Sequence, residues 1–127
     1  MRSIRLPNFL VLVTVMSLGL LCALPGVSQG HAFPDHSDPK VGSTVSDPPS
    51  TVRIWFDGDI EPAFSTITVR AMDGKTVDRG DGHVDSSDKT LLEASVPPLS
   101  PGTYLVIWSV VARDGHRTMG QYTFTVR

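Results

Sequence analysis

Apolar positions along most of this chain recur with a period of two, which is the spacing of side chains on one face of a β-strand. Short runs rich in Val, Ile, Thr and aromatic residues alternate with clusters of Pro, Gly, Asp and Ser. After residue 30, no useful length of chain carries apolar residues at helical spacing. The pattern therefore predicts strands with one buried face over residues 52–56, 67–71, 92–96 and 122–126.

The segment from Tyr104 to Ala112 is apolar at both odd and even positions, which predicts a central strand covered on both faces. The connecting segments are rich in turn-forming residues, and they span residues 47–50, 73–89 and 97–102. Six or seven short strands separated by such turns are typical of an all-β sandwich or barrel. We expect the β-sandwich.

The first 30 residues follow a different pattern. Two arginines precede an apolar run over residues 10–24, which is short for a helix that crosses a membrane. Small residues occupy both positions that a signal peptidase recognises if it cuts between Gly30 and His31. We predict that residues 1–30 are a signal peptide and residues 31–127 are one exported domain, with an uncleaved membrane anchor as the alternative.

The predicted mature domain is acidic and has no cysteine. Nine Lys and Arg residues face thirteen Asp and Glu residues, so its net charge is −4 and it has no basic surface typical of a nucleic-acid-binding protein. Cys22, the only cysteine, lies in the predicted signal peptide. A metal site in the domain must therefore use His, carboxylate, Met or backbone atoms. The Asp-rich segment 73–89 lacks the regular ligand spacing of a calcium loop.

His31 would be the first residue of the cleaved protein. A free α-amine and the Nδ1 atom of the same histidine can close a chelate ring on one metal ion. Cu(II) prefers such nitrogen-rich coordination and heads the affinity order of divalent ions for these ligands. The alternative is that His31 is an incidental residue in a frayed terminus.

Two Asp-Gly-His triplets could supply further ligands. Asp81-Gly82-His83 lies in the long polar segment, where ordering it would cost conformational entropy, so we expect a solvated loop histidine there. Asp114-Gly115-His116 lies in a short connection between a strand ending at Arg113 and one beginning near Met119. With His31, Asp114 and His116 would give one amine, two imidazoles and one carboxylate. The alternative is a simple hairpin turn, since Asp-Gly is a favoured turn dipeptide.

The remaining candidate residues indicate no further metal ligand and no catalytic group. We expect His36 to be a surface histidine and not an extra ligand. Met72 and Met119 are far apart in the sequence, which disfavours a thioether site for Cu(I). No serine or cysteine has a visible partner base, and no glycine-rich phosphate loop follows a strand, so the sequence indicates no hydrolase or nucleotide-binding protein.

Several short motifs of the predicted mature chain occur together. They are His31-Ala32, Glu61-Pro62-Ala63-Phe64-Ser65, Pro101-Gly102-Thr103-Tyr104 and Trp108-Ser109-Val110-Val111 leading to Asp114-Gly115-His116. Through these motifs the chain resembles the CopC family of bacterial copper-handling proteins over nearly all of residues 31–127. The resemblance implies an Ig-like Greek-key β-sandwich or barrel of about seven strands in the periplasm. It also implies one Cu(II) ion per chain, bound by the N-terminal histidine and by the residues that match Asp114 and His116.

Two features depart from the family pattern. Family members often carry a glutamate soon after the strand-ending phenylalanine, but Gly58 stands there, between Asp57 and Asp59. Some members also have a methionine-rich loop for Cu(I), whereas residues 73–89 contain no methionine. The chain therefore resembles the members that bind Cu(II) alone.

These observations predict a periplasmic Cu(II)-binding protein that is not an enzyme and acts as a monomer. It would sequester copper or deliver it to an inner-membrane copper transporter of the CopD type, a partner that the family resemblance implies. One alternative is a copper monooxygenase of the lytic polysaccharide class, which also uses an N-terminal histidine. Another is an Ig-like interaction module that binds no metal.

Overall fold

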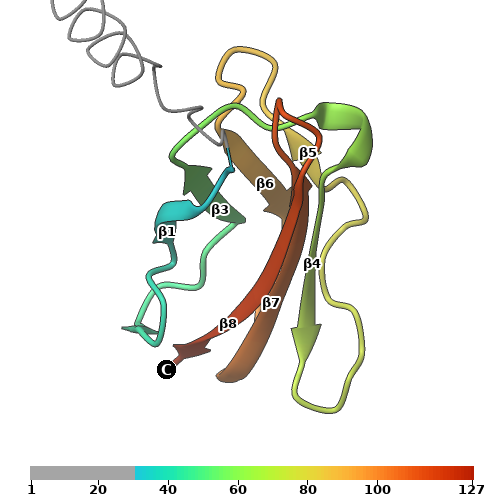
Figure 1. The fold of residues 1–127 in the computed structure, drawn as a ribbon. Helices are drawn as coiled ribbons and strands as arrows, with labels where there is room; N and C mark the ends of the chain where they lie inside the picture. Colours follow the sequence, from blue (N-terminus) through green and yellow to red (C-terminus); the bar gives the residue numbers. More distant parts are fainter. Residues whose placement is uncertain (1–30) are drawn as a thin grey trace, which may run out of the picture.

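Two packed β-sheets make up the protein in the computed structural model, which describes residues 31–127 (Figure 1). The predicted signal peptide and its cleavage site before His31 involve residues outside this part. Within residues 31–127, the structure has no helix that is long and apolar enough to cross a membrane. The elements are β1 (Pro34–Asp38), β2 (Thr44–Val45), β3 (Thr51–Phe56), the 3₁₀ helix η2 (Pro62–Phe64), β4 (Thr66–Ala71), β5 (His83–Val84), β6 (Leu91–Ser95), β7 (Gly102–Val111) and β8 (Arg117–Val126).

Each sheet has four strands, and the chain crosses repeatedly from one sheet to the other. One sheet has the order β1-β3-β6-β5 and the other has the order β2-β8-β7-β4. Strands β3 and β4 are consecutive in sequence but lie in different sheets, whereas β7 and β8 form a long antiparallel hairpin. This arrangement confirms the predicted all-β, Ig-like sandwich, with two of the eight strands only two residues long.

Alternating side chains from both sheets fill the core. In β3, the even-numbered residues Val52, Ile54 and Phe56 are buried and their neighbours are partly exposed, as the period-two pattern predicts. The ring of Phe56 meets that of Trp108 from the opposite sheet edge-to-face, with 5.2 Å between ring centroids. This contact joins the two layers through a favourable aromatic geometry.

The prediction that residues 104–112 form a strand covered on both faces is half wrong. Strand β7 is central, between β8 and β4, but only Tyr104, Val106, Trp108 and Val110 on it are buried. The intervening apolar residues are partly exposed on the outer face of the sheet. Strand β7 is apolar at both odd and even positions, but no other part of residues 31–127 covers the outer face of its sheet.

The sequence analysis did not predict strands β1 and β5, for two different reasons. The sequence of β1, Pro-Asp-His-Ser-Asp, has no apolar alternation, and the strand forms by antiparallel pairing with β3. Strand β5 lies inside segment 73–89, which we predicted to be loop throughout. Its two residues pair with β6, and Val84 buries its side chain in the core. A strand with a single buried residue has no alternating pattern that could be recognised in the sequence.

Candidate metal centre

The turn between β7 and β8 presents Asp114 and His116. The N–H of Ala112 donates to the carbonyl of His116 at 2.9 Å, and the N–H of Gly115 donates to the carbonyl of Ala112 at 2.9 Å. Gly115 has a φ of +86°, which glycine adopts without the strain that a Cβ atom would cause. These features are those of a three-residue hairpin loop with a left-handed glycine. Strand β8 begins at Arg117, two residues before the predicted position, so the loop is short and anchored on both sides.

Within this turn, two hydrogen bonds join Asp114 to His116. Asp114 Oδ1 accepts the backbone N–H of His116 at 3.0 Å, and Asp114 Oδ2 lies 2.9 Å from His116 Nδ1. The backbone N–H and the imidazole of His116, with a smaller contribution from His31, hold the pKa of Asp114 below its ordinary value. The carboxylate is therefore charged at neutral pH and suited to bind a cation.

His31 lies against this pair although it is more than 80 residues away in the sequence. Its ring centroid is 4.6 Å from that of His116, and the two rings are inclined at 53°. One ligand atom each from His31, Asp114 and His116 fall within 4.8 Å of one another. His31 is half-buried, whereas the other two residues are exposed. The structure thus brings together the three residues that the sequence analysis selected.

Two hydrogen-bonded anchors hold the segment that follows His31. Ala32 is buried, and its carbonyl accepts a hydrogen bond from Thr118 Oγ1 of β8 at 2.8 Å. The N–H of Phe33 donates to Asp57 Oδ1 at 2.8 Å, and the N–H of Asp57 donates to the Phe33 carbonyl at 2.9 Å. Thr118 lies on β8, and Asp57 directly follows β3 in the other sheet, so these bonds hold the two residues after His31 from both layers of the sandwich. Such support lowers the entropic cost of arranging a ligand.

The anchoring residues were missed by the sequence analysis. It noted Asp57 and Asp59 only as the neighbours of Gly58, where the family glutamate is absent. In the structure Asp57 holds the backbone of Phe33, and Asp59 Oδ2 lies 3.7 Å from Arg113 Nη1, next to the turn that carries the candidate ligands Asp114 and His116. The second pair is exposed and contributes little. A carboxylate directly after a strand end is too common to have identified either role.

We expect Thr118→Val to weaken both the fold and the site. The substitution keeps the side-chain shape but leaves the buried carbonyl of Ala32 without its donor, which lowers the free energy of unfolding by about 1 to 2 kcal/mol. Because His31 then loses one anchor, Cu(II) affinity should fall about tenfold. Denaturant unfolding and Cu(II) titration measure the two effects.

Thr125→Val is the matched control, because Thr125 lies on the same strand and its hydroxyl contacts the exposed Thr103 hydroxyl at the far end of β8. We expect it to leave Cu(II) affinity unchanged. If Thr118→Val lost stability but kept full Cu(II) affinity, the bond to Ala32 would serve the fold alone.

The other histidines have different surroundings. His83 is exposed on β5, where Nδ1 lies 2.7 Å from the Asp81 carbonyl and Nε2 lies 3.3 Å from Glu93 Oε1 of β6. Asp81 Oδ1 accepts the N–H of Ser95. The triplet 81–83 therefore links β5 to β6. His83 is exposed, as predicted, but it lies on the two-residue strand β5 and not in a loop, which corrects that part of the prediction. Within residues 31–127, His31, Asp114 and His116 are the one group of three or more candidate ligand residues.

His36 lies on the outer surface, as the sequence analysis expected. Its ring stacks on that of Trp55 with 4.4 Å between centroids and 9° between planes, and Nδ1 lies 2.9 Å from Asp35 Oδ2. These contacts hold His36 in place on β1, outside the group formed by His31 and its two neighbours.

Comparisons with known proteins point to one family. Residues 35–127 match the family model of the CopC domain. Protein YobA of Escherichia coli (strain K12) is 32% identical over 98 residues, which cover 76% of this chain and 79% of that protein. Copper resistance protein C of Pseudomonas syringae pv. tomato is 29% identical over 125 residues, covering 91% and 94% of the two chains.

A longer relative and a solved structure extend these similarities. Copper transport protein CutJ of Bacillus subtilis (strain 168) is 26% identical over 113 residues, which cover 88% of this chain but 21% of that protein. The crystal structure of CopC from Methylosinus trichosporium OB3b superposes with a TM-score of 0.67 and 32% identity, covering 76% of this chain and 93% of that one. The similarity in structure therefore spans most of the described domain.

Proposed function

Because this chain belongs to the CopC family, we propose that its exported form begins at His31 and binds one Cu(II) ion through His31, Asp114 and His116. The observation that carries the proposal is the convergence of these three residues within 4.8 Å. The α-amine of a cleaved terminus would add a fourth donor from His31 itself. One amine, two imidazoles and one carboxylate form a set that suits Cu(II).

The positions of the methionines support a preference for Cu(II) over Cu(I). Met72 follows Ala71, which pairs with Tyr104 at one end of β7, whereas Met119 pairs with Ser109 nearer the other end. These two pairs lie five residue steps apart along the extended strand β7, which is about 17 Å at the usual rise per residue. Both thioethers are exposed and too far apart to share a Cu(I) ion.

A carboxylate beside the two histidines favours a binding protein over a copper monooxygenase. Asp114 is ionised and adjacent to His116, where it would fill a coordination position that an oxygen-activating site must leave open. We therefore propose that the protein is not an enzyme. No feature of the site specifically favours the monooxygenase alternative.

We further propose that the protein acts in the periplasm as a monomer, after cleavage between Gly30 and His31. It sequesters Cu(II) or delivers it to an inner-membrane copper transporter of the CopD type. The similarity to about a fifth of a longer copper transport protein supports this partner, because a domain like this one is joined to a transport function in that relative. The similarity to a copper resistance protein supports sequestration equally.

The test is a Cu(II) titration of residues 31–127, in which His31 is the first residue and carries the N-terminal α-amine. We expect one equivalent to bind and to give a tetragonal, nitrogen-rich electron paramagnetic resonance signal. With free Cu(II) at 1,000 times Kd, native-state binding stabilises a protein by about 4.1 kcal/mol, so Tm should rise by at least about 10 °C. An unchanged Tm and the spectrum of aqueous Cu(II) would instead identify a metal-free interaction module.

A further inference from the structure

The segment that leads into β1 directs its side chains alternately into the core and away from it. Ala32 is buried, whereas His31 is half-buried and Phe33 is exposed. In extended chain, residues two apart point to the same side. Phe33 accordingly places its ring beside that of His31, with 6.1 Å between ring centroids and 56° between ring planes. This separation lies in the range of about 4.5 to 7 Å over which aromatic rings attract one another.

The backbone of Phe33 is fixed, although its side chain lies outside the core. Its N–H donates to Asp57 Oδ1 and its carbonyl accepts the N–H of Asp57, which directly follows β3. The residue is nevertheless 54% exposed, which is unusual for a phenylalanine. The ring therefore contributes little to the packing of the two sheets, and its closest chemical neighbour is a candidate ligand.

The ring of His31 lies between two other rings. The ring of His116 is 4.6 Å away and that of Phe33 is 6.1 Å away, between centroids. Within residues 31–127 no ring contact joins Phe33 to His116, so the two meet His31 from different sides. The χ1 angle of a histidine has three staggered wells. The flanking rings favour the one that keeps a His31 nitrogen within 4.8 Å of ligand atoms of Asp114 and His116.

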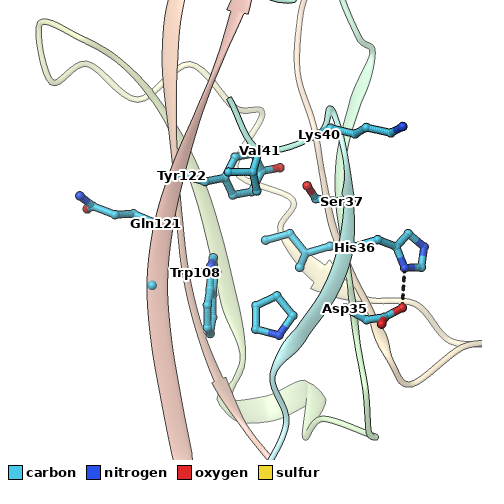
Figure 2. A pocket seen from close by; sticks show the side chains of 11 residues that line it. Asp35, His36, Ser37, Lys40, Val41, Trp108, Gln121 and Tyr122 are labelled. Carbon is cyan, nitrogen blue, oxygen red and sulfur yellow. Dashed lines mark hydrogen bonds and ion pairs between the residues drawn. The ribbon is translucent and has the colours of Figure 1, made fainter. Parts of the chain in front are cut away.

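The other histidine of this segment is held elsewhere. His36 lies at the cleft between β1 and β8, where Figure 2 shows its side chain directed outward from β1. Its Nδ1 lies 2.9 Å from Asp35 Oδ2, and its ring stacks on Trp55. It is outside the candidate ligand group. A His31 side chain that turned away from this group would therefore not be replaced by His36.

We propose that Phe33 is a positioning residue for the copper site, whose ring holds the imidazole of His31 beside Asp114 and His116 before the metal binds. The inference rests on the proposed Cu(II) site and assigns Phe33 no bond to the metal. An apparent Kd is the intrinsic Kd divided by the fraction of protein in the binding-competent state. If loss of the ring leaves the three χ1 wells of His31 equally populated, this fraction falls to about one third, and Kd rises about threefold.

The first part of the test uses the metal-free protein, residues 31–127, as the unmodified chain and as Phe33→Ala. The three-bond NMR couplings between the Hα and Hβ protons of His31 report its χ1 populations. We expect one dominant rotamer in the unmodified protein, with nuclear Overhauser effects between the ring protons of His31 and His116. In Phe33→Ala we expect averaged couplings and Overhauser effects about threefold weaker, since about a third of the molecules then keep this orientation.

The second part is a Cu(II) titration against a competing chelator. We expect Phe33→Ala to raise Kd about threefold or more, and Phe33→Tyr, which keeps the ring, to restore the Kd of the unmodified protein. Phe64→Ala is the matched control, because Phe64 is 61% exposed and its ring contacts no other ring in the described part of the chain. It should leave Kd unchanged. Since both phenylalanines are largely exposed, Phe33→Ala should change Tm no more than Phe64→Ala does.

Four results would overturn the proposal. Phe33→Ala could bind Cu(II) as tightly as the unmodified protein, or its His31 could keep the same rotamer populations. Phe33→Tyr could lose as much affinity as Phe33→Ala, so that the ring would not be the cause. Phe33→Ala could lower Tm well beyond Phe64→Ala, which would assign the ring to the fold. If the unmodified protein bound no Cu(II), the proposed function and this inference would fail together, whereas the four results above leave the proposed function intact.

Discussion

A protein with one extra glycine ahead of His31 is expected to bind Cu(II) at least 100-fold more weakly than the protein that begins at His31. The imidazole is retained, but the primary amine now belongs to the glycine, and the nitrogen of His31 becomes an amide. An amide nitrogen binds copper only after it loses its proton. A 100-fold loss corresponds to about 2.7 kcal/mol at about 1.4 kcal/mol per tenfold.

The anchors on Ala32 and Phe33 make this experiment specific. Ala32 is held by Thr118 and Phe33 by Asp57, so the extra residue leaves the His31 side chain beside His116. Fold, charge and side chains are otherwise the same in the two proteins. The expected difference in affinity therefore measures the contribution of the α-amine.

The spectrum has to be compared along with the affinity. A Gly-His terminus can itself take up Cu(II) through its amine, the intervening amide and the imidazole at neutral or higher pH. Such binding would give a different electron paramagnetic resonance signal from that of the protein beginning at His31. If the extended protein kept both the affinity and the spectrum, His31 would be an ordinary side-chain ligand, and cleavage after Gly30 would have no part in building the site.

The fold was predictable where burial follows a local pattern. Strands β3, β4, β6 and β8 each alternate buried and exposed residues, and their apolar residues revealed them. The pairing of β1 with β3 depends instead on backbone hydrogen bonds, which carry no side-chain signature. The outer face of β7 shows the converse limit, because apolar residues indicate burial only if another layer covers them.

The candidate ligands were predictable because each has a local chemical signature. His31 follows a predicted cleavage site, and Asp114 and His116 lie in a turn of recognisable sequence between two strands. The residues that hold the terminus have no such signature. Thr118 and Asp57 act on a segment that meets them only in the folded chain, more than 20 residues away in sequence.

The second large effect concerns the two Asp-Gly-His triplets. We expect His116→Ala to weaken Cu(II) binding at least 100-fold, because it removes one of the imidazoles that the three-residue group offers. His83→Ala removes an imidazole from the same local sequence, but its neighbours are the Asp81 carbonyl and Glu93. We expect it to change Cu(II) affinity by less than threefold.

The carboxylate of the triplet needs a variant that spares the turn. Asp114→Ala would also remove the acceptor for the His116 N–H and so disturb the loop itself. Asp114→Asn keeps an acceptor oxygen there but loses the charge, and we expect it to lower Cu(II) affinity at least tenfold with little change in Tm. Titration of His116→Ala, Asp114→Asn and His83→Ala under one set of conditions ranks the two triplets. If His83→Ala lowered Cu(II) affinity more than the other two variants, copper would bind beside β5, and the proposal of a site at the β7–β8 turn would be wrong.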